Sequence, residues 1–362
     1  MTTYRNWMQR ALALAQECAW VTAPNPRVGC VIVRDDQVLG QGVTQRAGGH
    51  HAEVQAIQDA QSRGYDVRGA TVYVTLEPCC HFGKTPPCTD ALIHAGISKV
   101  VAALEDPNPL VAGQGLATLR AAGIDVVCGV MADQARETHI GFLTRMRTGQ
   151  PWVRMKVAAS LDGRTALQNG QSQWITSPAA REDGHRWRAR ADAVVTGIGT
   201  VQKDDPQLTV RLASFLGPQP RRIVVDSRLE IDLNARVLVD GAWVATATEN
   251  CLKIEQLRDR GVEVLVLPNE QGKVDLPALM NELGRRQINE VHVEAGHRLN
   301  GALVRAHCVD ELLLYLAPTL LGDAVGMMDL GVLTQLQQGV PLVFHEVQLL
   351  GDALRVLARF KK

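Results

Sequence analysis

The sequence predicts an α/β protein of two domains, each built on a sheet that is covered by helices. The chain has 362 residues, enough for two domains that each bury a core of their own. Short apolar runs alternate with helical patterns along both halves, which is typical of mostly parallel sheets with helices on both faces. In TGQPWV, residues 148–153, a Gly and a Pro separate a long helix from a new strand. We therefore predict domains at residues 1–148 and 149–362.

The first half begins with a helical pattern over residues 1–20, followed by a hairpin made of VGCVIVRDD and QVLGQGV. After the hairpin, helices and strands alternate, and Gly residues follow the helices. The predicted order is a helix at 52–62, a strand at 70–78, a helix at 88–96, a strand at 99–106, a helix at 115–123, a strand at 124–129 and one long helix at 131–149.

The second half repeats the alternation but ends differently. Its apolar runs predict strands at residues 152–160, 193–199, 221–227, 262–268, 290–296 and 311–318. The last segment, LVFHEVQLLGDALRVLARF, is typical of two strands joined by a Gly-Asp turn. A terminal hairpin of this kind favours a mixed sheet, and the two halves do not resemble copies of each other.

The charge balance limits the kinds of partner. Lys plus Arg and Asp plus Glu number 38 each, so the formal net charge is zero. Bulk binding to nucleic acid or to an anionic membrane needs an excess of cations, so we expect neither. The N-terminus lacks the apolar core of a signal peptide, and there is no apolar stretch of about 18 residues. We therefore expect a soluble, cytoplasmic protein with small-molecule ligands.

The eight cysteines divide into two groups. Five are scattered, mostly in apolar runs, and are typical of small buried residues in a reducing compartment. The other three, Cys79, Cys80 and Cys88, lie within ten residues in EPCCHFGKTPPC. This cluster stands apart from the rest and is the first candidate for a functional site.

His51 and Glu53, in HAEVQAI, stand at the head of a predicted helix. On their own they fit a surface helix start, where the helix dipole favours an acid. Together with Cys79 after a strand and Cys88 at the next helix start, His51 completes a three-ligand zinc site that leaves the fourth position for water. Glu53 is too close to His51 to be a comfortable ligand, but it is well placed to move protons to and from that water.

The order His-x-Glu, then Pro-Cys, then a later Cys is the zinc deaminase signature. Here eight residues separate the two cysteines instead of two. The alternative is a closed structural zinc site with Cys80 or His81 as the fourth ligand. Glu53 would have little to do in such a site, so we favour the catalytic interpretation.

Four motifs of the first half, PNPRVGCVIV, HAEVQAI, VTLEPC and GKTPPC, occur in the order found in the bifunctional deaminase/reductase family of riboflavin biosynthesis. SLDGRTAL, SQWITS, DDPQLTVR, VVDS and VEAG continue the resemblance, so the sequence resembles that family over nearly its whole length. TPPC and the long gap between the cysteines distinguish it from cytidine and tRNA adenosine deaminases. The resemblance implies a cytidine-deaminase-like three-layer αβα domain followed by a dihydrofolate-reductase-like α/β domain.

The resemblance also implies two reactions. The first domain would hydrolytically deaminate 2,5-diamino-6-ribosylamino-4(3H)-pyrimidinone 5′-phosphate. The second would reduce the ribosyl group of the product, 5-amino-6-(5-phosphoribosylamino)uracil, to ribityl. The cofactors implied are Zn²⁺ and NADPH. We also expect a homo-oligomer, either a dimer or a tetramer.

Carried over by position, the resemblance assigns the deaminase residues. His51, Cys79 and Cys88 would hold zinc, and Glu53 would shuttle protons. The residues that would contact the substrate are Asn25, His81 and Lys84. Their chemistry fits, because an amide suits the edge of the base and a cation suits the phosphate. The alternatives are a turn residue for Asn25 and a solvated loop charge for Lys84.

Three positions depart from the family pattern. Thr44 stands where the family has a His seven residues before the zinc ligand, which puts the way the substrate is held in doubt. Cys80 stands where a Ser is common, and His50 is a possible competitor of His51. The spacing to Glu53 favours His51 as the ligand.

The second half carries a weaker signal of its own. It has no GxGxxG fingerprint after a strand, so a standard dinucleotide-binding fold is unsupported. TGIGTVQKDDPQL follows a strand, and its backbone is open enough to approach a phosphate, although an ordinary turn fits equally well. NADPH in preference to NADH rests mainly on the resemblance, with weak support from Ser227 and Arg228, where an acid would argue for NADH.

The resemblance assigns the reductase residues as well. The residues that would contact the substrate are Ser172, Arg188, Arg211 and Glu294, with the two arginines on its phosphate. The residues that would line the cofactor are Ala158, Trp174, Thr200, Asp204, Ser227 and Gly296. The alternatives are a core aromatic for Trp174, a charged helix face for Arg188 and a capping carboxylate for Glu294.

Two other functions compete with this interpretation. A nucleic-acid base-editing deaminase with a binding module would need cations and stacking aromatics, which the balanced charge and the few aromatic residues do not offer. A zinc-stabilised scaffold whose second half senses a nucleotide would contain zinc but release no ammonia from the diaminopyrimidine.

Overall fold

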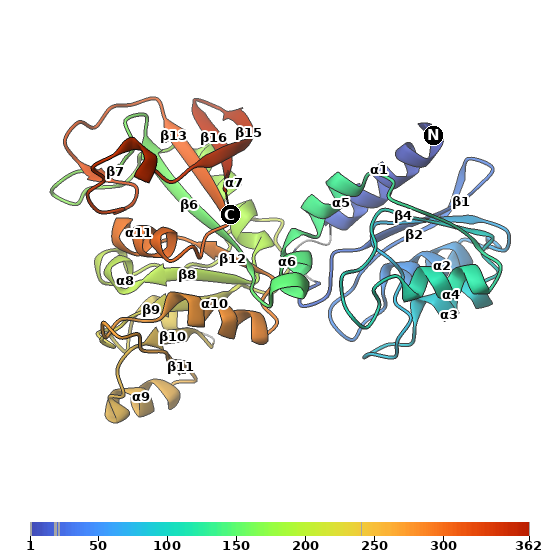
Figure 1. The fold of residues 1–362 in the computed structure, drawn as a ribbon, viewed down its shortest axis with the longest axis horizontal. Helices are drawn as coiled ribbons and strands as arrows, with labels where there is room; N and C mark the ends of the chain where they lie inside the picture. The colour runs from blue at the N-terminus through green and yellow to red at the C-terminus, as the bar shows by residue number, and fades with distance from the viewer. Residues whose placement is uncertain (1, 18–19, 21, 240, 362) are drawn as a thin grey trace. The chain divides into compact units, whose positions relative to one another are not determined.

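The computed structural model describes residues 2–17, 20, 22–239 and 241–361, and it divides into two compact units, Met1–Gly149 and Gln150–Lys362. The division falls inside TGQPWV, where the alternation of helices and strands is interrupted. Each unit has its own sheet and its own apolar core, so each is described by itself (Figure 1). Among the described residues, no helix is both long and apolar enough to cross a bilayer.

The first unit is built on a five-stranded sheet in the order β2-β1-β3-β4-β5. Strand β1 runs antiparallel to both of its neighbours, whereas β3, β4 and β5 run parallel to one another. The strands are β1 at Gly29–Arg34, β2 at Gln37–Val43, β3 at Thr71–Val74, β4 at Lys99–Ala102 and β5 at Asp125–Cys128. The predicted hairpin is therefore correct, and the three parallel strands follow it.

Helices cover both faces of this sheet and make three layers (Figure 1). Helices α1 and α5 contact each other on one face, while α2, α3 and α4 lie in a row on the other. The helices are α1 at Thr2–Glu17, α2 at Ala52–Ser62, α3 at Cys88–His94, α4 at Gln114–Ala121, α5 at Ala132–Thr138 and α6 at Ile140–Thr148. This arrangement confirms the predicted three-layer αβα architecture.

The backbone of helix α2 packs directly against the backbone of strand β2. A Cβ atom at Gly40 would lie 2.2 Å from the carbonyl oxygen of Ala56, and one at Gly42 would lie 2.3 Å from that of Ala52. Only glycine leaves room for so close an approach. Because α2 begins one residue after His51, strand β2 helps to set where that side chain enters the site.

The single long helix predicted at residues 131–149 is wrong, because the structure has two helices that meet at His139. The backbone of His139 has φ −98° and ψ 10°, outside the helical range of its neighbours. Its buried ring reaches the end of β3, where Nε2 lies 3.2 Å from both the carbonyl oxygen and Oγ1 of Thr75. We attribute the bend to this contact, which a periodicity argument does not detect.

The second unit is built on a nine-stranded sheet in the order β11-β10-β9-β8-β12-β6-β13-β16-β15. The strands from β11 to β13 are parallel, and β16 and β15 add two antiparallel pairings at one edge. The strands are β6 at Trp152–Ser160, β8 at Ala193–Gly197, β9 at Arg221–Val225, β10 at Trp243–Thr246, β11 at Glu263–Val266, β12 at Glu290–Val293, β13 at Glu311–Ala317, β15 at Leu342–Leu350 and β16 at Ala353–Phe360. The predicted mixed sheet and terminal hairpin are confirmed.

Strand β10 is missing from the sequence prediction, although it is as long as β3 and β4, which the sequence predicts. The small sheet formed by β7, Arg164–Ala166, and β14, Val325–Gly326, is missing because strands of three and two residues give no recognisable pattern. The helices of this unit are α7 at Pro178–Arg190, α8 at Ile198–Asp204, α9 at Cys251–Arg258, α10 at Leu276–Arg285 and α11 at His297–Arg305.

Three central strands of the second unit set its functional edge. Strand β12 lies between β8 and β6 and is parallel to both, so the three carboxyl ends lie at one edge of the sheet. Helix α8 begins directly after β8, and α11 begins four residues after β12. Ligands of open α/β sheets bind at edges of this kind.

Candidate active sites

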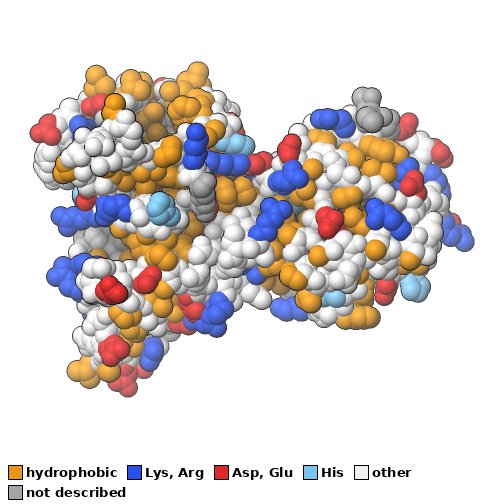
Figure 2. Space-filling view, viewed as in Figure 1, with side chains coloured by type: hydrophobic (Ala, Val, Ile, Leu, Met, Phe, Trp, Pro, Cys, Tyr) orange, Lys and Arg blue, Asp and Glu red, His pale blue; other side chains and the backbone are white. Residues whose placement is uncertain are grey.

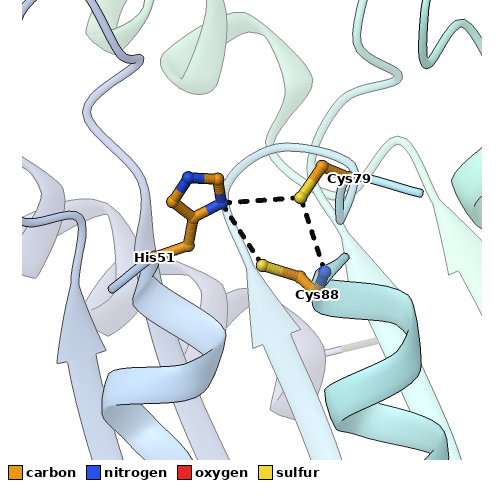
Figure 3. Close-up of side chains that lie close together, drawn as sticks. All are labelled: His51, Cys79 and Cys88. Carbon is orange, nitrogen blue, oxygen red and sulfur yellow. Dashed lines mark hydrogen bonds between the residues drawn. The ribbon is translucent and has the colours of Figure 1, made fainter. Parts of the chain in front are cut away.

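Three side chains from three separate elements meet beside the sheet of the first unit (Figure 3). His51 precedes α2, Cys79 lies in the loop after β3, and Cys88 is the first residue of α3. The Nδ1 atom of His51 lies 3.5 Å from Sγ of Cys79 and 3.3 Å from Sγ of Cys88. A tetrahedral zinc site with Zn–S of about 2.3 Å and Zn–N of about 2.0 Å has edges of roughly 3.5 Å. The three donors are therefore spaced as zinc ligands.

The hydrogen bond between the two thiols shifts their pKa values in opposite directions. The hydrogen bond with Cys88 lowers the pKa of Cys79 to about 4, although burial opposes this. The same bond and burial raise the pKa of Cys88 well above its usual range. In addition, the backbone N–H of Cys88 donates to Sγ of Cys79 at 3.4 Å. Cys79 is thus already stabilised as a thiolate, the form in which cysteine binds metals.

The alternative ligands lie outside this cluster. Sγ of Cys80 lies 3.9 Å from the carbonyl oxygen of Leu110, and the ring of His50 contacts the side chain of Gln58. Across the described ranges, the three residues of Figure 3 are the one group of His, Cys, Asp and Glu that is close enough to hold a metal. This group includes neither Cys80 nor His81, so the geometry gives no support to a closed structural site.

Glu53 lies on the first turn of α2 and is 4% exposed. Burial, followed by the charge of Cys79, raises its pKa to about 7, and His51 opposes this shift only partly. A carboxyl group with a pKa near the working pH is suited to both accepting and releasing a proton. The interpretation of Glu53 as an exposed helix-start carboxylate is wrong.

The other residues assigned to the deaminase lie on loops. Asn25 is half-buried in the loop before β1, where its backbone N–H donates to the carbonyl oxygen of Thr22. His81 and Lys84 lie on the loop that joins the two cysteine ligands, and the side chain of Lys84 is exposed. Thr44 is buried, and its hydroxyl accepts a hydrogen bond from the backbone N–H of Val28 beside the hairpin.

In the second unit, Glu294 follows β12 and forms a two-bond ion pair with Arg188 of α7. Nε of Arg188 lies 2.6 Å from Oε1, and Nη2 lies 2.9 Å from Oε2. Nη1 of Arg188 donates to the carbonyl oxygen of Thr209 at 2.6 Å. Burial alone would raise the pKa of Glu294, but Arg188 and Lys156 outweigh burial and hold it well below its usual range. The structure thus fixes Glu294 as a charged carboxylate.

Two residues beside this pair were missed by sequence reasoning. Nδ1 of His185 accepts a hydrogen bond from the backbone N–H of Arg211 at 3.4 Å and lies 3.3 Å from Nη1 of Arg188. Burial and the two arginines lower the pKa of His185 to about 4, so its ring is neutral near pH 7. Lys156 lies in the middle of β6, where burial lowers its pKa. A lysine within a buried parallel strand is a signal that could have been used.

The residues assigned to the cofactor lie mostly along the same edge. A Cβ atom at Gly296 would lie 3.8 Å from Oγ1 of Thr200, so the starts of α8 and α11 are close together. Asp204 is exposed at the end of α8, and Ser227 follows β9 and accepts a hydrogen bond from the backbone N–H of Val274 at 3.1 Å. Ala158 is a half-buried residue of β6.

Trp174 and Ser172 lie on the loop between β7 and α7. The Trp174 side chain is 69% exposed and stacks on Arg181, whose guanidinium lies 4.5 Å from the ring centre. The alternative of a core aromatic for Trp174 is therefore wrong. Ser172 is half-buried.

Two family models match the two units. Residues 1–104 match the cytidine and deoxycytidylate deaminase zinc-binding region, and residues 151–354 match the RibD C-terminal domain. The riboflavin biosynthesis protein RibD of Escherichia coli (strain K12) is 47% identical over 359 residues, which cover 95% of this chain and 96% of that protein. The chain belongs to the RibD family. RibD of Haemophilus influenzae is 42% identical, with 97% and 95% covered.

Solved structures of RibD proteins share the whole fold. Acinetobacter baumannii RibD, form 1, has a TM-score of 0.90 and 41% identity, and the match covers 100% of this chain and 99% of that one. The deaminase/reductase of Thermotoga maritima has a TM-score of 0.89 and 32% identity, with 99% of each chain covered.

These comparisons confirm the predicted family, the α/β fold of both halves and the two activities. The protein is a bifunctional enzyme of riboflavin biosynthesis, with a zinc-binding deaminase unit and a reductase unit. Its cofactors are Zn²⁺ and NADPH, and its substrates are small molecules.

Proposed function

We propose that His51, Cys79 and Cys88 hold the zinc of the deaminase and that Glu53 moves the proton during hydrolysis. The observation that carries this proposal is the spacing of three donors together with the buried carboxyl group of Glu53, two residues after His51 on the first turn of α2. When bound, zinc supplies a Lewis acid that makes water a nucleophile near neutral pH. Glu53 would take a proton from the water and pass it to the ring and the departing amine.

The substrate of this unit is 2,5-diamino-6-ribosylamino-4(3H)-pyrimidinone 5′-phosphate. We assign its contacts to Asn25, His81 and Lys84. The half-buried amide of Asn25 suits the polar edge of the base, and the exposed ammonium of Lys84 suits the phosphate. His81 lies on the same loop as Lys84, and its Nδ1 atom is buried without a hydrogen-bond partner in the structure, so a substrate group could bind there.

In the second unit, NADPH reduces the ribosyl group of the deaminated product to ribityl. We propose that Glu294 contacts the ribosyl hydroxyls, because it is a charged acceptor at the carboxyl end of β12. Ser172 and Arg211 would complete the substrate site. Arg188 uses its guanidinium on Glu294 and Thr209 in this structure, so it would reach a phosphate only by giving up one of these bonds.

The cofactor would lie along the same edge of the sheet. The start of α11 at Gly296, with Thr200 beside it, offers backbone N–H groups for a pyrophosphate. We assign the remaining cofactor contacts to residues at the strand ends and on the neighbouring loops: Ala158, Trp174, Asp204 and Ser227.

We also propose that the enzyme is a homo-oligomer, a dimer or a tetramer. The edge strand β15 exposes Leu342, Phe344, Val347 and Leu349, which lie where hydrophobic side chains gather over β15 and β16 in Figure 2. Exposed apolar edge strands tend to pair with another chain. Sedimentation of the wild type and of Phe344→Lys would test this. A monomeric wild type would contradict the proposal.

A cytoplasmic location and the absence of nucleic-acid and membrane partners also remain proposals. The described cysteines are free thiols, and zinc binding needs two of them reduced. On the face shown in Figure 2, positive and negative side chains are interspersed, as expected from the balanced composition.

One experiment tests the two reactions together. The purified protein is incubated with the diaminopyrimidine phosphate, with and without NADPH, and the products are identified by mass. We expect the deaminated uracil alone without NADPH and its ribityl form with NADPH. Zinc in the protein without any deaminated product would favour a scaffold and contradict the proposal.

A further inference from the structure

A buried carboxylate next to the metal loop has no role in the chemistry described above. Glu77 lies two residues before Cys79 and is 4% exposed. Its Oε2 atom accepts hydrogen bonds from the backbone N–H groups of Asp106 and Gly113, each at 3.0 Å. Its Oε1 atom accepts a third from Leu116, also at 3.0 Å. A single side chain thus holds three backbone groups spread over eleven residues of sequence.

The three bonds join two loops. Glu77 belongs to the loop that leads into Cys79, whereas Asp106 and Gly113 bracket the loop between β4 and α4. Helix α4 has no side-chain cap of its own at Gly113, so Glu77 supplies the missing acceptor from another part of the chain. The backbone N–H of Glu77 also donates to the carbonyl oxygen of Leu104 at 2.9 Å. The attachment therefore uses both the main chain and the side chain.

One further contact places the loop at residues 105–113 beside the segment that carries Cys79. Sγ of Cys80, the neighbour of Cys79, lies 3.9 Å from the carbonyl oxygen of Leu110.

We propose that Glu77 is a positioning residue of the deaminase: its carboxylate fastens the loop at residues 105–113 to the loop that carries Cys79. The fastened loop forms the face of the deaminase site next to the metal, so its position sets how tightly the diaminopyrimidine phosphate is held. Glu77 touches neither the metal nor the reacting atoms. This inference rests on the proposed deaminase site.

The test uses the full-length, zinc-loaded enzyme and the variant Glu77→Gln. An amide offers only one acceptor oxygen in place of two, so at least one of the three N–H groups loses its partner. We expect the KM for the diaminopyrimidine phosphate to rise about tenfold, with a smaller change in kcat. Zinc content and reductase activity should stay at wild-type values. Hydrogen exchange at Asp106, Gly113 and Leu116 should become faster.

Glu17→Gln is the matched control, because it removes the same charge from an exposed position at the end of α1, outside the loop at residues 105–113. We expect it to leave the KM unchanged. If Glu77→Gln does not fold, Gly115→Ala gives a second test. Its added Cβ would lie 2.1 Å from the carbonyl oxygen of Pro78 and 3.1 Å from Oε1 of Glu77, so the start of α4 must move away from the loop that carries Cys79 while the Glu77 carboxylate is kept. The same rise in KM is expected from this variant.

Four results would overturn the proposal. An unchanged KM together with faster loop exchange would make Glu77 a purely structural cap, and an unchanged KM in Gly115→Ala would do the same. Loss of zinc from Glu77→Gln would place its role in the metal site, and an equal effect of Glu17→Gln would make the effect one of charge. Failure of the wild type to deaminate would instead contradict the proposed function, so the two failures are distinguishable.

Discussion

Each unit has a glutamate that we place in its active site, but the pKa values of the two carboxyl groups are shifted in opposite directions. Burial and the charge of Cys79 raise the pKa of Glu53 to about 7. Burial acts on Glu294 in the same sense, yet Arg188 and Lys156 hold its pKa well below the usual range. The difference lies in the partners, since Glu53 faces thiols and Glu294 faces two cations.

This comparison shows that burial alone does not decide how a carboxyl group behaves. The balance between lost hydration and nearby charge decides it. Glu53 is suited to accept and release a proton near neutral pH, as hydrolysis requires. Glu294 is suited to remain charged and to accept hydrogen bonds from substrate hydroxyls. One residue type is thus suited to two chemistries within one chain.

The largest effect is expected from removing the thiolate that faces Glu53. Cys79→Ser should lose zinc and with it the deaminase activity, because one donor of a three-ligand site is gone. Cys88→Ser should behave in the same way, and Cys80→Ser should keep both zinc and activity. Metal analysis of the purified variants measures this. If Cys80→Ser loses the metal while Cys79→Ser keeps it, the ligand assignment is wrong.

The next effect comes from Glu53→Gln, which keeps the size of the side chain but cannot accept a proton. Deamination should fall by at least about 10²-fold, the usual scale for the loss of a general acid/base. Zinc should stay, because Glu53 is not a ligand. With pre-deaminated substrate, NADPH oxidation should proceed at close to the wild-type rate. Surviving deamination would remove Glu53 from the mechanism, and loss of both activities would contradict separate catalytic units.

Arg188→Gln should bring the pKa of Glu294 closer to that of Glu53. Arg188 lowers the pKa of Glu294, so its removal raises that pKa. Below the raised pKa the variant protonates Glu294, whereas the wild type keeps it ionised. We expect reductase kcat/KM to fall about tenfold at neutral pH and further as the pH falls, because a bidentate partner is lost.

A pH profile of NADPH oxidation measures the Arg188→Gln effect. Arg186→Gln is the matched control, since Arg186 lies on the same helix and pairs with the exposed Glu182 at 2.7 Å. The control should follow the wild-type profile. A wild-type profile for Arg188→Gln as well would mean that the ion pair does not govern Glu294.

The smallest effect is expected at Ser227, away from both carboxyl groups. The wild type should bind NADPH more tightly than NADH, and Ser227→Asp should weaken NADPH binding about tenfold by placing an acid near the extra phosphate. Calorimetric titration with both nucleotides measures the change. Ser227→Ala is the control and should keep the preference for NADPH. If Ser227→Asp keeps it too, Ser227 does not face that phosphate.

Much of the metal site follows from local sequence. His51 and Glu53 share one helix start, and Cys79 and Cys88 each lie next to a predicted element boundary, so pattern and spacing bring the candidates together. The alternation of apolar runs and helical patterns predicts sheets with helices on both faces, and the terminal hairpin predicts the mixed sheet. Strand β10 escaped this reasoning, although its four residues equal the length of β3, β4 and β5, which the sequence predicts.

The residues that escaped prediction act through distant partners. Lys156 lowers the pKa of Glu294 across more than a hundred residues of sequence, and Glu77 reaches N–H groups of another loop and of the first turn of α4. The ring of His139 breaks a regular helix by reaching back to Thr75. Periodicity describes which face of an element is buried, but it does not specify which polar group will be found there.

Because Gly40 and Gly42 let α2 touch β2 backbone to backbone, the strand helps to fix the start of α2, which His51 immediately precedes. How long the enzyme keeps its metal when free zinc becomes scarce is then a property of the hairpin as well as of the ligands. We expect Gly42→Ala to lose zinc to a competing chelator faster than the wild type, although all three donors are unchanged. Equal release rates would show that α2 shifts on β2 without moving the imidazole of His51.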